Sequence, residues 1–126
     1  MIRYVYNTQR KPPAPFVLVT IRHPLSGAEV RDVPAQLDTG ADRSLIPQAI
    51  VDALGLDFSG SLTIGGVGGT VEEMKLYPAA VGIHRLEPQL VEVLSHPDEP
   101  WVLLGRDLLN NFRLLLDGPG LALEIG

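Results

Sequence analysis

Cysteine is absent from the 126 residues of this sequence, which excludes disulfides and thiolate chemistry and leaves the redox compartment open. No apolar run of about 18 residues occurs either, so the sequence predicts no membrane-spanning helix. The segment Met1–Tyr6 lacks the apolar stretch of a secretory signal peptide. From these absences we expect a cytoplasmic protein that does not use a membrane as its partner.

The sequence also has no excess of positive charge, and its formal net charge is −5. A surface of this sign repels phosphate backbones and anionic lipids, which argues against nucleic acid as a partner. Histidine is scarce, and His23, His84 and His96 lie too far apart in sequence to show a metal-binding spacing. We expect all three histidines at the surface, and we expect neither a metal ion nor another cofactor.

One tight turn is the most informative feature that is present. Asp38–Gly40 follows the apolar run Val33–Leu37 and precedes a second apolar run at Ser44–Pro47. Such a turn can hold a carboxylate in a fixed orientation at the mouth of a β-structure. On its own, the tripeptide also fits an ordinary β-turn in which Asp accepts backbone N–H bonds and Gly supplies a positive φ. It occurs once, whereas a pair of catalytic carboxylates needs two.

Two further segments favour a functional interpretation of that turn. Leu62–Val71 places four glycines around one valine between β-prone flanks, which is typical of a mobile hairpin tip. A phosphate-binding loop is a poorer interpretation, because the chain continues into the acidic, β-like Thr70–Glu73 and not into a helix. Trp101–Leu109 is an apolar strand that ends at Gly105 and runs into a short helix. Taken alone, this last segment is a strand-to-helix corner without chemistry.

In this order, Asp38–Asp42, Ile64–Gly69 and Leu103–Leu109 resemble the retropepsins, the single-domain aspartic proteases of retroviral type. The resemblance runs from about Phe16 to Ile125. It implies an all-β fold, namely a small closed acid-protease barrel with two short helices, one active-site turn per chain and a flap hairpin.

The order of apolar runs and turns agrees with that fold, because many short strands with frequent turns are typical of a small barrel. We expect the first helix to begin at Pro47 and to end at Gly55, and the second to occupy Gly105–Asn111. Ser95–Pro100 is expected to be a polar loop. Asp117–Gly120 is expected to be the turn of a last hairpin and not a second active site.

The resemblance implies two regions of unequal length. Residues 1–15 are expected to form an N-terminal extension or a dimer strand, and residues 16–126 the retropepsin-like protease domain. A chain of this length is one domain, and it is too short for the two-lobed pepsin type, which carries one active-site Asp in each lobe. The second Asp must therefore come from a second copy of the chain.

The implied function is that of an aspartic endopeptidase active as a homodimer. Two Asp38 carboxylates in close contact cannot both ionise cheaply, so the pair shares one proton. The ionised member acts as general base on a water, and the protonated member polarises the peptide carbonyl. The expected partners are the second copy and an extended peptide or unfolded protein as substrate.

The resemblance also implies roles for the residues around Asp38. Thr39 would bond across the dimer axis, and Gly40 would offer its carbonyl to the substrate. Ala41 would line the site where two-lobed relatives carry a hydroxyl residue, and Asp42 would pair with Arg106. The flap that closes over the substrate would consist of Ile64, Gly65, Gly66, Val67, Gly68 and Gly69.

Two other functions remain open at this point, because a fold does not fix an activity. The chain could be a non-catalytic peptide-binding module that keeps the cleft. It could also be an autoprocessing or scaffold domain whose main output is dimerisation.

Overall fold

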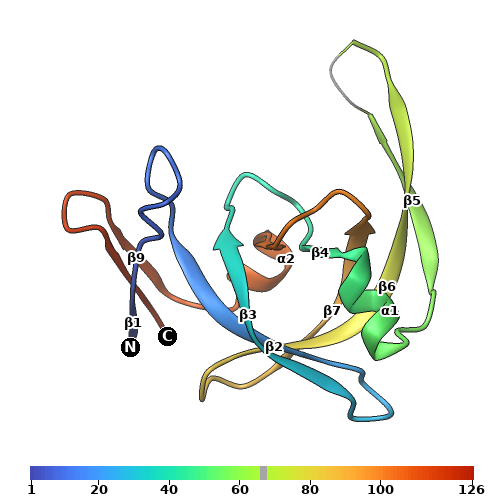
Figure 1. Ribbon diagram of the computed structural model, residues 1–126, viewed down its shortest axis with the longest axis horizontal. Coiled ribbons are helices and arrows are strands. Elements are labelled where there is room, and N and C mark those ends of the chain that lie inside the picture. Colours follow the sequence, from blue (N-terminus) through green and yellow to red (C-terminus); the bar gives the residue numbers. More distant parts are fainter. Residues whose placement is uncertain (66–67) are drawn as a thin grey trace.

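The computed structural model describes residues 1–65 and 68–126 of the chain. Its architecture is a barrel of short strands with two short helices, a small separate sheet at the chain termini and one long projecting hairpin (Figure 1). Gly66 and Val67, both expected in the flap, lie outside the described residues. The strands are β1 Ile2–Val5, β2 Phe16–Arg22, β3 Glu29–Leu37, β4 Leu45–Pro47, β5 Gly60–Gly65, β6 Val71–Ile83, β7 Gln89–His96, β8 Val102–Leu104, β9 Leu114–Asp117 and β10 Ala122–Ile125, and the helices are α1 Gln48–Leu54 and α2 Arg106–Leu109.

The barrel closes through six strands. Its order is β2-β3-β8-β4-β7-β6, and β6 pairs back onto β2. Residues that alternate along the strands point inward, as Val17, Val19 and Ile21 of β2 do with at most 1% of their surface exposed. The predicted all-β closed barrel with two short helices is confirmed.

The pairing of β3 with β8 positions the segment that follows β3. These two strands run parallel, with Leu37 opposite Leu104. Parallel strands end at the same edge of a sheet. The turn that begins at Asp38 and the corner at Gly105 therefore meet, although they are far apart in the sequence.

The second helix is shorter than the predicted 105–111, because Gly105 and Asn110 are its caps and the helix spans Arg106–Leu109. Two further predicted boundaries were wrong by one or two residues, for a common reason. Pro47 precedes the first helix as its N-cap, with φ −60° and ψ 140°, because it still pairs with His96 as the last residue of β4. The pairing of Ile46 with Ser95 likewise keeps Ser95 and His96 in β7, so the predicted polar loop starts at Pro97. The sequence pattern of neither segment contains the register of its partner strand.

The N-terminal strand pairs within its own chain. β1, β10 and β9 form a three-stranded antiparallel sheet, in that order, with Tyr4 opposite Leu123. Leu123 and Ile125 are fully buried against the barrel core. The turn between β9 and β10 is the predicted hairpin, in which the Gly120 N–H donates to Asp117 Oδ1 at 2.9 Å. We call this unit the terminal sheet (Figure 1).

The expectation that all three histidines lie at the surface was wrong for His23, which is 7% exposed. Its Nδ1 accepts hydrogen bonds from the backbone N–H groups of Leu25 and Ser26, each at 3.1 Å. Nε2 therefore carries the ring proton and lies 3.1 Å from Asp57 Oδ2. A neutral imidazole with all its polar atoms paired is tolerated in the interior.

None of the helices in residues 1–65 and 68–126 is long and apolar enough to cross a membrane.

Candidate active site

The turn after β3 holds the Asp38 carboxylate by backbone groups. The Asp38 N–H donates to the Leu104 carbonyl at 2.9 Å, which fixes the start of the turn on β8. The Gly40 N–H then donates to Asp38 Oδ1 at 3.0 Å, and the Ala41 N–H to the Asp38 carbonyl at 3.1 Å. In the described part of the chain Oδ2 has no hydrogen-bond partner. One carboxylate oxygen is thus anchored and the other is available for chemistry.

The exposure of this turn suits a site that meets another molecule. Asp38 and Ala41 are half-buried, whereas Thr39 and Gly40 are exposed. We call residues 38–44 the Asp38 loop. Its polar tip therefore faces outward at the end of the barrel from which the long hairpin also rises (Figure 1).

Helix α2 braces the Asp38 loop from below. Arg106 Nη1 donates to the Thr39 carbonyl at 2.8 Å, and Arg106 Nη2 forms an ion pair with Asp42. The Arg106 N–H also donates to the Ala41 carbonyl at 2.9 Å. A guanidinium can make these two side-chain contacts at once because its donors form a fixed fork. The structure thus brings Thr39, Ala41, Asp42 and Arg106 together around Asp38.

A second brace, between Ser44 and Asp107, was not predicted from the sequence. Ser44 is 1% exposed, and its Oγ–H donates to Asp107 Oδ1 at 2.7 Å. The same Oγ accepts from the Gly105 N–H at 3.0 Å, in a buried hydrogen bond. The Ser44 N–H donates to both Asp107 carboxylate oxygens, at 3.0 and 2.9 Å. The sequence carries no signal for this brace, since Ser44 follows the charged Asp42 and Arg43, and Asp107 follows Arg106.

Gly105 is required where the two segments touch. A Cβ at this position would lie 2.6 Å from the Arg43 carbonyl carbon and 2.8 Å from its oxygen. It would also lie 3.0 Å from the Ala41 carbonyl oxygen. All of these atoms belong to the backbone and cannot rotate away. Only glycine lets β8 and α2 approach the Asp38 loop this closely.

The long hairpin of β5 and the first half of β6 stands beside the Asp38 loop, and we call it the flap hairpin. Ile64 pairs with Glu72 and Gly65 with Val71, so the strands run to the edge of the undescribed tip. Gly68 and Gly69 have φ of 84° and 78°, which side chains other than glycine rarely adopt. The predicted flap residues Ile64, Gly65, Gly68 and Gly69 thus lie at the end of an exposed hairpin.

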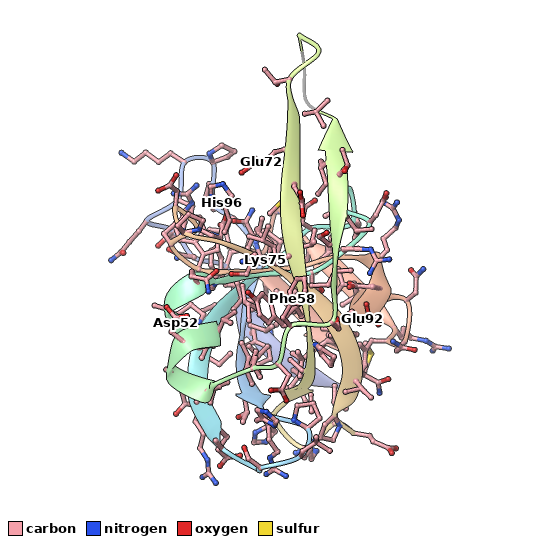
Figure 2. The ribbon with its side chains drawn as sticks, turned by 90° about the vertical axis from the view of Figure 1, so that its right-hand side faces the viewer. Asp52, Phe58, Glu72, Lys75, Glu92 and His96 are labelled. Carbon is pink, nitrogen blue, oxygen red and sulfur yellow. The ribbon has the colours of Figure 1, made fainter. Side chains whose placement is uncertain are left out.

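The flap hairpin is tied to the barrel at its outer part and near its base. His96 Nε2 lies 3.0 Å from Glu72 Oε1, which joins β6 to the end of β7 (Figure 2). Lower on the hairpin, the Lys75 ammonium lies 5.8 Å from the centre of the Phe58 ring (Figure 2). Cation–π contacts of this length are attractive. The contact of Glu72 lies near the outer end of the hairpin, opposite Ile64, and that of Lys75 lies near its base, opposite Ser61.

A cleft of about 540 Å³ lies between the Asp38 loop and the flap hairpin. Its volume is within the range of small-ligand pockets. Its apolar wall consists of Leu62, Ile64 and Leu94, and its polar wall carries Asp42 and Arg43. A cleft with one apolar and one polar wall can accept the side chains of an extended peptide on the first and its polar groups on the second.

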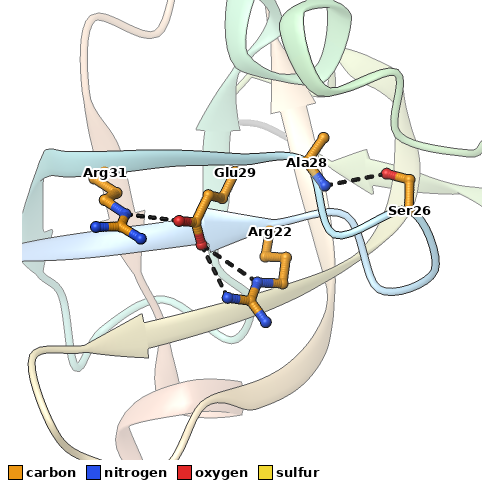
Figure 3. Close-up of polar contacts among 5 residues, drawn as sticks. All are labelled: Arg22, Ser26, Ala28, Glu29 and Arg31. Carbon is orange, nitrogen blue, oxygen red and sulfur yellow. Dashed lines mark hydrogen bonds and ion pairs between the residues drawn. The ribbon is translucent and has the colours of Figure 1, made fainter.

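A second cavity, of about 610 Å³, lies at the opposite end of β3. Three of its charged groups are joined, because Glu29 accepts hydrogen bonds from Arg31 at 2.6 Å and from Arg22 at 3.0 Å (Figure 3). Arg31, followed by Arg22, lowers the pKa of the Glu29 carboxyl. These contacts fix the β2–β3 hairpin, and the lining also holds Asp32, which forms no ion pair with the described residues.

Side chains suited to a metal ion do not gather in the described residues, where no three His, Asp or Glu lie close enough to share one.

A family model described as "gag-polyprotein putative aspartyl protease" matches residues 28–111, a span that contains the Asp38 loop, the flap hairpin and α2. The chain belongs to this family. The predicted membership of the retropepsin-like aspartic proteases is confirmed. The comparison with curated protein sequences gives no match.

Solved structures of retropepsins share the fold. The EIAV protease, complexed with the inhibitor HBY-793, is 26% identical at a TM-score of 0.61, with 86% of this chain and 93% of that one covered. A retropepsin-like aspartic protease from Rickettsia conorii is 16% identical at a TM-score of 0.67, with 97% and 86% covered. The retroviral protease-like domain of Ddi1 from Leishmania major is 20% identical at a TM-score of 0.54, with 89% and 87% covered. At 16% and 20% identity, the last two structures support the fold assignment alone.

Proposed function

We propose that the protein is an aspartic endopeptidase that works as a homodimer, in which the Asp38 carboxylates of two chains activate one water. The observation that carries this proposal is the anchored Asp38 carboxylate, with one free oxygen, at an exposed turn beside an apolar cleft. One chain supplies half of such a site. The other half comes from the same turn of a second copy, since two-fold pairing is the commonest symmetry of oligomers.

The terminal sheet is the surface that we assign to the second copy. Four large apolar side chains are exposed on it, with Val5 at 68%, Leu115 at 51%, Leu116 at 48% and Leu121 at 40%. The outer edges of β1 and β9 also pair with no other strand among the described residues. Exposed apolar groups beside open strand edges favour association. Residues 16–126 then form the protease domain, and β1 adds the N-terminal segment to the dimer surface.

The chemistry follows from bringing two carboxylates together. One of them stays protonated because two adjacent negative charges repel, and aspartic proteases are the standard example of such a dyad. The ionised carboxylate takes a proton from the water as the oxygen attacks the peptide carbonyl carbon. The protonated carboxylate donates a hydrogen bond to the carbonyl oxygen, and the proton taken up then passes to the leaving amine. The pKa values involved belong to the pair and not to one chain.

The neighbouring residues position this dyad. Thr39, exposed at the tip of the loop, bonds across the dimer axis to the partner turn, and the Gly40 carbonyl faces the substrate backbone. Asp42 and Arg106 hold the loop on α2. The flap hairpin closes over an extended peptide and excludes water from the site.

The test compares the wild-type protein with Asp38→Asn on an unfolded protein substrate at mildly acidic pH. We expect cleavage by the wild type and none by Asp38→Asn. The matched control is Asp117→Asn, since Asp117 sits in the other Asp-Gly turn and accepts a similar backbone bond from Gly120. Cleavage that persists in Asp38→Asn would refute the assignment of the catalytic residue. A dimer that binds peptides and cleaves none at any pH would instead be a binding module.

A further inference from the structure

Arg43 places an unpaired positive charge in the cleft. It follows Asp42 in the Asp38 loop and lines the cleft with the apolar Leu62, Ile64 and Leu94. Its side chain makes no hydrogen bond and no ion pair with any of the described residues. The other charged residue of the lining, Asp42, is held by Arg106.

The carboxylates near the flap hairpin do not neutralise Arg43 either. Glu72 is engaged with His96 at 3.0 Å. Glu73 points to the opposite face of β6 from Glu72, since neighbouring strand residues alternate in direction. Arg22 and Arg31 show the contrasting case, because both are paired with Glu29 in the other cavity.

An unpaired guanidinium that is half-buried beside apolar side chains favours a carboxylate ligand. It is partly shielded from water, which strengthens its attraction for an opposite charge. Its fork of N–H donors also matches the two oxygens of a carboxylate. In a cleft that receives a peptide, the ligand of this chemistry is an Asp or Glu side chain.

We infer that Arg43 selects substrates with an acidic residue near the cleaved bond, beside an apolar residue that enters the pocket of Leu62, Ile64 and Leu94. This inference rests on the proposed function in one respect, that the cleft receives a peptide. In a two-fold dimer each half of the cleft carries one Arg43. The preferred acidic positions therefore lie on both sides of the cleaved bond, one for each copy.

The test uses a set of eight-residue fluorescent peptides with two central Leu residues and Ala elsewhere. One Ala at a time is replaced by Glu, Gln or Lys, and cleavage is measured as kcat/KM at low salt. We expect Glu to exceed Gln by about three- to tenfold at one position on each side of the centre, as one partly buried ion pair would give. A peptide with Glu at both positions should combine the two gains, because separate sites act additively.

Variants at Arg43 separate its own charge from the charge of the whole protein. Arg43→Gln should abolish the preference for Glu over Gln, and Arg43→Glu should favour Lys. The control is Arg85→Glu, an exposed site in the β6–β7 turn at the far end of β6 from the flap hairpin, with the same change in net charge. It should keep the preference for Glu. A loss of preference in Arg85→Glu equal to that in Arg43→Glu would overturn the inference.

Binding distinguishes a failure of this inference from a failure of the proposed activity. The same peptides are titrated against Asp38→Asn, which removes cleavage and leaves Arg43 in place, with fluorescence anisotropy as the readout. Tighter binding of Glu than of Gln peptides, lost in Asp38→Asn with Arg43→Gln, supports the role of Arg43 even if the wild type cleaves nothing. Equal binding of Glu and Gln peptides, or binding of neither, overturns it even if the wild type is an active protease.

Discussion

Asp107 accepts hydrogen bonds from both the backbone N–H and the hydroxyl of Ser44, a residue 63 positions earlier in the chain. These bonds join the Asp38 loop to helix α2 beneath the exposed turn. They lie next to the Gly105 N–H, which also donates to the Ser44 hydroxyl at 3.0 Å. The hydroxyl is therefore a single point at which the loop, the end of β8 and α2 are held together.

Ser44→Ala removes that point, and we expect it to lower the free energy of unfolding by about 1–3 kcal/mol. The loss is this large because the Gly105 N–H is left buried without a partner, and because the lost bond to Asp107 is charge-assisted. Urea unfolding monitored by Trp101 fluorescence measures the effect. Ser26→Ala is the matched control, since the Ser26 hydroxyl accepts one bond from the Ala28 N–H in an exposed turn (Figure 3). It should cost less than about 0.5 kcal/mol, and equal losses in both variants would contradict the proposed role of Ser44.

Gly105→Ala tests the close approach of β8 and α2 to the Asp38 loop. The new methyl group would lie 2.6 to 3.0 Å from backbone atoms of Arg43 and Ala41, so the loop must shift. We expect a loss of about 3 kcal/mol, as for other cases of overpacking, together with a loss of peptide cleavage. Thermal unfolding and cleavage of one peptide are measured on the same preparation.

Gly118→Ala is the control for that variant, because a Cβ at Gly118 has no other heavy atom within 4 Å. It should keep both the stability and the activity of the wild type. If Gly105→Ala behaved in the same way, the loop and the helix would not be packed as closely as described.

The sequence allowed the residues at the tip of the site to be predicted more fully than those beneath it. Asp38, the glycine-rich hairpin and Arg106 each carry a local pattern of turn, glycine or helix start. Ser44 and Asp107 have no such pattern, because each matters only through a partner that the parallel pairing of β3 and β8 brings close. Long-range register is what single-segment patterns lack.

The same limit explains two misplaced features elsewhere in the fold. His23, which follows the end of β2, looked like a surface residue because its polar atoms are paired by three groups that its local sequence does not reveal, two in the next turn and one at Asp57. Residues 1–15 were expected to form an N-terminal extension or a dimer strand, and the pairing of β1 with β10 of the same chain was not predicted. Strand propensity identifies a strand and leaves its neighbour undetermined.

Tyr4 in the terminal sheet should make the protein sensitive to alkaline pH. Burial raises the pKa of the Tyr4 phenol, with a further rise from the Asp32 carboxylate, while a hydrogen bond with the Leu18 backbone acts in the opposite direction. As pH increases, the unfolded chain therefore loses this proton first. The free energy of unfolding is unaffected by Tyr4 below the unfolded pKa of about 10 and falls as pH rises through the higher folded pKa.

Tyr4→Phe removes this titration, so we expect its stability to fall less steeply than that of the wild type between about pH 9 and pH 11. Urea unfolding at several pH values measures both proteins, and all other titrating groups cancel in the comparison. Between about pH 7 and pH 9 the two curves should run parallel, since the phenol is protonated in both states. Parallel curves over the whole range would show that Tyr4 is not buried as described.

The terminal sheet should decide whether the protein dimerises. Replacing Leu115 and Leu116 together by Ser removes two exposed apolar side chains from the proposed interface. Because both chains of the dimer carry the change, four leucines are lost, and if each contributes about 1–2 kcal/mol when buried by the partner, the dimer dissociation constant should rise by about a thousand- to a millionfold. Sedimentation velocity over a range of concentrations measures it. Cleavage of a peptide should fall in proportion to the fraction of dimer, because each chain carries only one Asp38.

Leu25→Ser is the control for the interface, since Leu25 is 87% exposed in the turn between β2 and β3, outside the terminal sheet. It should leave the dissociation constant and the cleavage rate unchanged. If the double variant at Leu115 and Leu116 stayed dimeric, the dimer interface would have to lie on another face of the barrel. A monomeric double variant that retained full activity would contradict the mechanism itself. A single Asp38 would then suffice for hydrolysis, and the proposal of a proton shared by two carboxylates would be wrong.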